Sequence, residues 1–282
     1  MNAVTLLLQG TVVLASPLIL AAMGGLCSER AGVANIALEG KMLIATIAVF
    51  LTTSATHSPM LGLAAGIGAA LVLSLLHFVL TQKYALDHVV SGMAINAIAF
   101  GAANFLDKRF TDPTAGEMAR LPLAAYWGFA IALPVVMVLY LGRTRGGIHL
   151  QAVGSAPAKA RQMGLSPARV RLLGLIWTGV FCGIAGALIV SNTGNYVDNM
   201  TAGKGFIALA ALIIGGWRPL PTLGACLAFG LFQQLQIQLQ GVRPGGFEIA
   251  VELWICLPYV VTIVALAGFL GKNRTPAGLG KP

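Results

Sequence analysis

Charged residues are scarce in this chain of 282 residues: Asp, Glu, Lys and Arg make up only 10%, and only nine residues are acidic. A soluble domain carries about 25% charged residues. Here 57% of the residues are hydrophobic and the mean hydropathy is +0.84, which excludes a soluble globule of this size. The net charge of +9 does not indicate a nucleic-acid-binding surface in so apolar a chain. The composition predicts a polytopic membrane protein.

Motifs for catalysis, metal binding and secretion are also missing. The four cysteines form no C-x-x-C pair and the four histidines are scattered, so we expect no disulfide framework, metal site or cofactor. No G-x-x-x-x-G-K-[ST] motif is present, and the chain therefore does not cradle ATP phosphates in the usual way. Residues 1–23 have no basic stretch before their apolar run, which favours a membrane span over a signal peptide.

Charge-free stretches define the expected spans. A helix needs about 20 apolar residues to cross the hydrocarbon core, and the stretch 42–82 is long enough to divide into two at residues 52–59. Nine segments result, centred near residues 14, 45, 70, 98, 133, 182, 211, 231 and 261. We expect helices, because lipid offers no partner to backbone amides. Gly62, Gly66, Gly179 and Gly183 are spaced as close-packing helix faces.

The distribution of positive charge predicts the orientation. Six Lys and Arg residues and no acid lie between Arg143 and Arg171, and three more with no acid follow Leu270, so these two segments carry as much charge as the whole chain's net +9. The positive-inside rule places both in the cytoplasm. The C-terminus is then cytoplasmic and, with five segments before Arg143, the N-terminus lies outside.

A short internal match indicates an inverted repeat. The triplet Ile36-Ala37-Leu38 follows the first segment, and Ile207-Ala208-Leu209 follows the sixth. We predict one transmembrane domain, 1–282, with repeat 1 at about 4–106, a connector span at 125–142, a cytoplasmic loop at 143–171 and repeat 2 at about 172–270. Inverted repeats with interrupted helices are typical of transporters and place the solute pathway between the halves.

Polar residues near the interrupted segments are the candidates for that pathway. An acid at mid-membrane costs about 2.5–3.5 kcal/mol on insertion scales, so Glu39 needs either a functional role or a structural bond to Lys41, Arg30 or free backbone groups. Asparagine amides both donate and accept hydrogen bonds, so they suit a pathway for a polar solute. The candidates for the pathway are Asn35, Glu39, Asn96, Asn104 and Asn199.

The basic loop 143–171 contains signals for a short helix of about two turns at 156–164. Ser155 is a candidate N-cap, Pro157 suits the first turn and Gly164 suits the end. Ser166 and Pro167 then start the next span. So short a helix is marginal in water and must pack against the bundle or a partner. The residues expected to make this contact are Ser155, Ala156, Pro157, Ala158, Lys159, Ala160, Arg161 and Gly164.

The chain resembles the permease subunits of bacterial ABC importers of the branched-chain amino acid, simple-sugar and nucleoside superfamily, and most of all the shorter permease of the nucleoside type. The resemblance lies in the stretches Ser28–Gly40, Val90–Asn96, Ala152–Gly164, Asn199–Ala211 and Gly215–Leu220. Two positions depart from the family pattern: Lys41 stands where apolar residues are usual, and Ser155 where an acidic residue is commoner.

The resemblance implies a permease of the bacterial inner membrane, embedded in the lipid bilayer and working with other subunits. These are a second, similar permease, a cytosolic ABC ATPase that docks the 156–164 helix, and an extracytoplasmic binding lipoprotein. Hydrolysis would belong to the ATPase, so this chain is not expected to be an enzyme. The implied solute is a nucleoside, with a simple sugar, a vitamin B6 compound or a branched-chain amino acid as alternatives. A rival reading is an ion-coupled secondary transporter that uses Glu39 or Glu252.

Overall fold

The computed structural model describes residues 3–111, 118, 122–239, 260, 263 and 275–281. Within these residues the regular structure is entirely helical, as expected from the lack of charge. The elements are α1 (Ala3–Arg30), α2 (Leu38–Thr56), α3 (Pro59–Phe78), the π-helix η1 (Val79–Lys83), α4 (His88–Phe110), α5 (Leu123–Arg143), α6 (Arg145–Ser155), α7 (Pro157–Gln162), α8 (Pro167–Thr193), α9 (Lys204–Ile214) and α10 (Pro219–Leu239).

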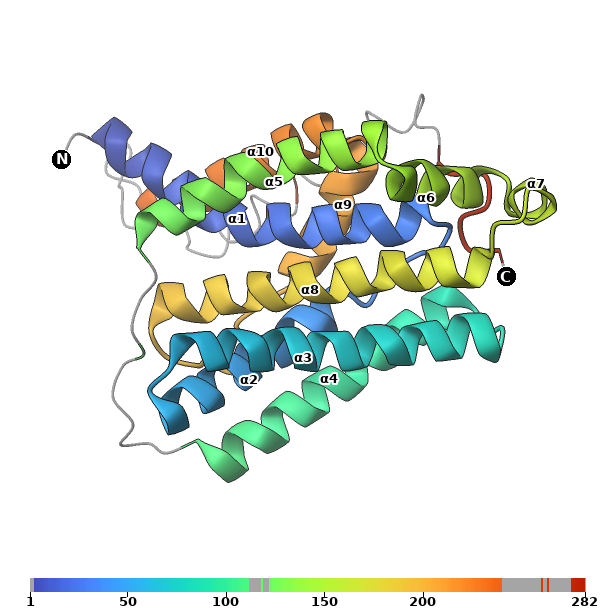
Figure 1. The fold of residues 1–282 in the computed structure, drawn as a ribbon. Coiled ribbons are helices and arrows are strands. Elements are labelled where there is room, and N and C mark those ends of the chain that lie inside the picture. Colours follow the sequence, from blue (N-terminus) through green and yellow to red (C-terminus); the bar gives the residue numbers. More distant parts are fainter. Residues whose placement is uncertain are drawn as a thin grey trace.

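Seven of the described helices are long and apolar enough to cross a membrane: α1, α2, α3 with η1, α4, α5, α8 and α10. Most of them run side by side along the bundle, whereas the 11-residue α9 crosses behind α1 at a steep angle (Figure 1). Eight of the nine expected segments correspond to these helices and α9. The ninth, near residue 261, lies outside the described residues except for Val260 and Ile263, so the number of crossings stays a prediction.

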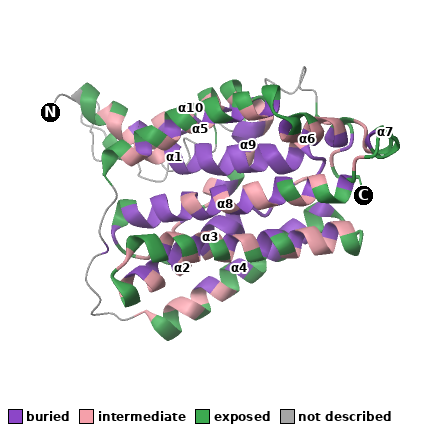
Figure 2. Ribbon diagram, in the orientation of Figure 1, coloured by how far each residue is buried: buried purple, intermediate pink, exposed green. Residues whose placement is uncertain are grey.

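The bundle is built around α1, α2 and α8. In their most apolar windows 61–72% of the residues are buried, against 22–28% in α3, α4, α5 and α10, and Figure 2 shows the difference along the ribbons. The outer helices instead expose large apolar side chains, such as Val72, Phe105 and Ile131 at 59–64%. Apolar surface of this extent is stable in lipid rather than in water.

Glycines allow the inner helices to approach closely. A Cβ on Gly62 would lie 2.0 Å from Thr53 Oγ1 of α2, and one on Gly183 would lie 2.5 Å from Ile67 Cα of α3. Gly66 and Gly179 make similar contacts between the same helices, so the expected packing role of all four is confirmed.

The two Ile-Ala-Leu triplets do not occupy equivalent places. Ile36 and Ala37 precede α2, whose first residue is Leu38, whereas Ile207–Leu209 lies inside α9, which begins at Lys204. The match therefore does not align the starts of the two helices. The repeat and its boundaries stay a prediction, supported by the interruptions before α2 and α9.

Candidate functional site

Among the residues that the structure describes, several polar contacts between distant parts of the bundle lie at two interruptions. The first is the segment 31–37 between α1 and α2, and the second is the segment 194–203 between α8 and α9. Backbone groups at helix ends lack partners within the helix, and lipid supplies none. Buried side chains must therefore satisfy them.

Glu39 connects the two interruptions. It lies in the first turn of α2 and is only 8% exposed. Its carboxylate accepts hydrogen bonds from three groups at the start of α9: Thr201 Oγ1 at 2.6 Å, Gly203 N at 2.8 Å and Gly205 N at 2.6 Å. A carboxylate at a helix N-terminus satisfies free N–H groups and complements the helix dipole. The sequence left three structural partners open for Glu39: Lys41, Arg30 or free backbone groups. Glu39 binds free backbone N–H groups, and these lie at the start of α9.

Asn35 organises the first interruption. It is completely buried; its Nδ2 donates to Ser28 Oγ and its Oδ1 accepts from Lys41 Nζ, both at 3.0 Å. Its backbone N–H donates to Glu29 Oε1 at 3.3 Å. Lys41 is completely buried as well, and a buried ammonium requires such an acceptor. The departure of Lys41 from the family pattern is thus accommodated by the Asn35 amide.

Trp217 ties this network to the turn after α9. Its Nε1 donates to Glu29 Oε2 at 2.5 Å, and its carbonyl accepts from Arg30 Nε at 2.9 Å and Nη2 at 2.6 Å. The sequence reasoning did not select Glu29, Arg30 or Trp217 as site residues. The sequence did contain a signal for two of them. Glu29 and Arg30 lie at the end of the first apolar span, where a charged side chain needs a partner.

Asn96 of α4 satisfies the backbone at the start of α2. Its Oδ1 accepts from Gly40 N at 2.8 Å and its Nδ2 donates to Ile36 O at 3.0 Å. A Cβ on Gly40 would lie only 2.8 Å from Asn96 Oδ1, so glycine is needed for the contact. The amide is half-buried and stabilises the interruption.

Asn104 and Asn199 lie apart from this network. The amide of Asn104 faces the Asp198 carboxylate, and its hydrogen bonds are satisfied when its nitrogen donates to that carboxylate. Asn199 is exposed in the segment before α9, with a φ of 53°. Nearby, burial and the charges of Asp198 and Asp107 raise the pKa of Tyr196 to about 12.

The basic loop forms two helices rather than one. α6 was not expected, and the predicted helix at 156–164 is shorter, since α7 spans Pro157–Gln162. Ser155 ends α6, and the N-cap of α7 is Ala156, without a side-chain cap bond. The predicted cap at Ser155 is therefore wrong. Pro157 does occupy the first turn, as expected.

The end of α7 follows the prediction closely. Gly164 has a φ of +83°; its N–H donates to Arg161 O, and Leu165 N donates to Ala160 O, each at 3.0 Å. These two bonds form a Schellman motif, which requires a residue in the left-handed region. The helix lies at the opposite end of the bundle from the N-terminus (Figure 1).

One face of α7 points away from the bundle. Ala160 is 1% exposed and packs inward, whereas Met163 is 81% exposed. Ala158, Lys159 and Arg161 are exposed too, and Figure 2 shows α7 as largely exposed. The exposed face of α7 therefore carries both apolar and basic side chains.

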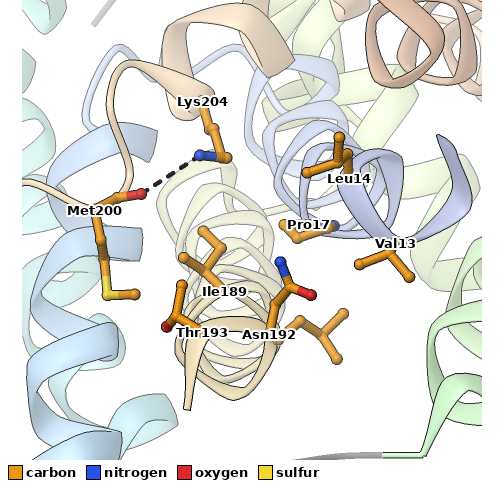
Figure 3. A pocket seen from close by; sticks show the side chains of 9 residues that line it. Val13, Leu14, Pro17, Ile189, Asn192, Thr193, Met200 and Lys204 are labelled. Atoms are coloured by element: carbon orange, nitrogen blue, oxygen red, sulfur yellow. Dashed lines mark hydrogen bonds between the residues drawn. The ribbon is translucent and has the colours of Figure 1, made fainter. Parts of the chain in front are cut away.

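A pocket lies near the other end of the bundle, between α1, α8 and α9 (Figure 3). Asn192, Thr193 and Lys204 are its polar side chains, and Lys204 Nζ donates to Met200 O at 3.4 Å. Pro17 has no N–H, so the carbonyl of Val13 lacks its helical donor at this wall. The other lining residues are Leu14, Leu188 and Ile189. Few polar groups on an apolar wall are typical of sites for small molecules.

Comparison with known proteins gives full-length relatives. The chain is 34% identical to the guanosine ABC transporter permease protein NupQ of Bacillus subtilis and 32% identical to the nucleoside ABC transporter permease protein NupC of Lactococcus lactis. Each alignment covers 99% of this chain and 96% of the relative. Among solved structures, a chain of an inward-facing metal-chelate-type ABC transporter has a TM-score of 0.58 at 13% identity, with 92% of this chain and 85% of that chain covered. This likeness shows the fold alone.

The family model described as "Branched-chain amino acid transport system / permease component" matches residues 7–266. The match covers nearly the whole chain, including both interruptions and the loop that carries α7. The chain therefore belongs to this family of ABC transporter permeases, and it is a multi-pass membrane permease.

Proposed function

We propose that this chain is the membrane-spanning subunit of an ATP-driven importer that brings nucleosides into the bacterial cytoplasm. The observation that carries the proposal is the similarity to guanosine and nucleoside permeases over 99% of the chain. The permease works in the inner membrane with a second permease subunit, a cytosolic ABC ATPase and an extracytoplasmic binding lipoprotein. Its N-terminus lies outside and its C-terminus inside.

α7 is the helix that docks in the ATPase. Its exposed face, with Met163 and Arg161, lies on the side where positive charge accumulates. When ATP binding closes the ATPase, the docked helix moves and carries α6 and α8, which flank it in the chain. α8 packs against α1, α2 and α3, so this motion reaches the centre of the bundle.

The solute pathway runs past the two interruptions. Asn35, Glu39 and Asn96 hold the broken segments that border it, while Asn104 and Asn199 lie nearer its outer mouth. The cavity volume of the pocket is about 80 Å³, whereas pockets that hold small-molecule ligands measure about 300–1,000 Å³. A base joined to a ribose is larger, so a nucleoside enters only when α1 and α8 move apart.

Uptake by cells that express the chain with its companion subunits tests the proposal. Labelled guanosine, uridine, ribose and leucine are compared with ATP depleted and, separately, with the proton gradient collapsed at constant ATP. We expect nucleoside uptake that is lost only when ATP is depleted. Uptake that depends on the proton gradient would contradict ATP-driven import. ATP-driven uptake of ribose or leucine alone would contradict the proposal that the solute is a nucleoside.

A matched pair of variants tests the docking surface. Met163→Glu places an acid on the exposed face of α7, and Met60→Glu places one at a residue of similar exposure, 74%, at the start of α3. We expect the first to abolish co-purification of the ATPase and the second to leave it intact. Ala160 is unsuitable for this test because it faces the bundle.

A further inference from the structure

The segment 275–281 lies at the end of the bundle that carries α7 (Figure 1). Gly278 N donates to Gly154 O of α6 at 2.8 Å, and Gly280 N donates to Gly32 O, just after α1, at 3.0 Å. One short segment thereby binds both the helix before α7 and the first interruption.

Arg171 adds a third attachment, at the start of α8. Its Nη2 donates to Lys281 O at 2.7 Å and its Nη1 donates to Gln82 Oε1 of η1 at 2.6 Å. The side chain is only 2% exposed. Its guanidinium therefore joins α8 and η1 to the same segment, with the fork geometry that makes Arg suited to several acceptors.

The segment fits because the contact is between backbones. A Cβ on Gly154 would lie 2.0 Å from Arg30 O, and one on Gly278 would lie 2.8 Å from Gly154 O and 3.1 Å from Pro157 Cδ. Gly32 has a φ of +95°, which favours glycine. Three layers of main chain are stacked here without room for a side chain.

We propose that residues 275–281 form a strap that positions α7 relative to the first interruption, so that movement of α7 is transmitted to the pathway. The inference rests on the proposed function, since it takes α7 as the ATPase-docking helix. α7 has only six residues and follows a change of direction at Ala156, where φ is −150°. Without the strap, the chain bends at Ala156 when α7 moves. The movement of α7 then does not reach Gly32 or the hydrogen bonds that Asn35 and Glu39 make.

The test compares solute imported per ATP hydrolysed in the purified, fully assembled complex in liposomes. Gly278→Ala inserts a methyl group between the strap and α6, and deletion from Thr275 onward removes the strap. We expect both complexes to bind the ATPase and hydrolyse ATP while solute per ATP falls about tenfold, the factor that corresponds to about 1.4 kcal/mol. Because the ratio is measured on assembled complex alone, a lower yield of one variant does not affect it.

Two control variants test whether the effect comes from the strap contacts rather than from a lost charge or an added methyl group. Lys281→Ala removes a charge from the segment but keeps the carbonyl that Arg171 binds, and Gly142→Ala adds a methyl group where no atom lies within 4 Å. Both should keep the wild-type ratio. A wild-type ratio in Gly278→Ala or in the deletion overturns the strap, as does weaker ATPase binding with the ratio unchanged. The proposed function is judged separately, from the wild-type complex and its choice of solute.

Discussion

The bond between Glu39 and the start of α9 gives the sharpest prediction. Glu39→Gln keeps the shape of the side chain, and its amide oxygen still accepts from Thr201 and Gly203, which both bind Oε1 in the wild type. The amide nitrogen then faces the N–H of Gly205, where Oε2 accepts at 2.6 Å. One buried donor loses its partner, and the negative charge at the N-terminus of α9 disappears.

The expected cost follows from these losses. A hydrogen bond to a charged group contributes about 1.5–3 kcal/mol to stability, so Glu39→Gln should lose about that much. Glu39→Ala loses all three bonds and should cost about twice as much or more. Thr201→Val removes one of the three bonds to the carboxylate and should cost about 1.5–3 kcal/mol.

The assay is the apparent melting temperature of the purified permease, measured together with uptake. A change of 1 kcal/mol shifts the melting temperature of a domain of 150–250 residues by about 2–4 °C, so Glu39→Gln should melt about 3–12 °C lower and retain part of its transport. The reasoning is refuted if Glu39→Gln melts like the wild type but loses transport. The carboxylate would then act on the translocated species, as in an ion-coupled transporter.

Three further predictions concern other contacts. Gly205→Ala places a Cβ 2.4 Å from the backbone N of Glu39 and should lower stability by about 1–3 kcal/mol in a thermal melt, whereas Gly101→Ala, which meets no atom within 4 Å, should not. Trp217→Phe removes the donor to the buried Glu29 and should cost about 1–3 kcal/mol; an unchanged melting temperature would show that this bond is dispensable. Because the pKa of Tyr196 is raised to about 12 from about 10, the fold favours its neutral form, and the stability that this adds is lost as pH rises from 10 to 12. Tyr196→Phe should reduce that alkaline loss and remove one late-titrating tyrosine from an absorbance titration.

Much of the framework was predictable because it depends on local chemistry. Long runs without charge predicted the helices α1–α5, α8 and α10, since a span must satisfy its own backbone bonds in lipid. The Schellman end of α7 at Gly164 was predictable for a similar reason, because it depends on a few adjacent residues. Ser155 failed as a cap because α6 continues to it; the signal for that helix is its own N-cap, Thr144, whose hydroxyl accepts from Gly147 N.

The partners of the polar residues were not predictable. Asn35, Glu39 and Asn96 were recognised as polar groups beside an interruption, but Glu39 binds Thr201, which is 162 residues away along the chain. Hydrogen-bonding capacity belongs to the residue type, whereas the identity of the partner depends on how the helices cross.

The sequence by itself determined that this protein resides in a membrane, where most of its described helices lie and which loop carries the basic helix. Hydrophobicity, charge and glycine act within one or two turns, so one segment of chain is sufficient to show them. Only the tertiary structure decided that Glu39 caps α9, that Trp217 joins Glu29 and Arg30, and that residues 275–281 bind Gly154 and Gly32. Each of these contacts needs two distant segments at hydrogen-bonding distance, and packing of the whole bundle fixes that distance.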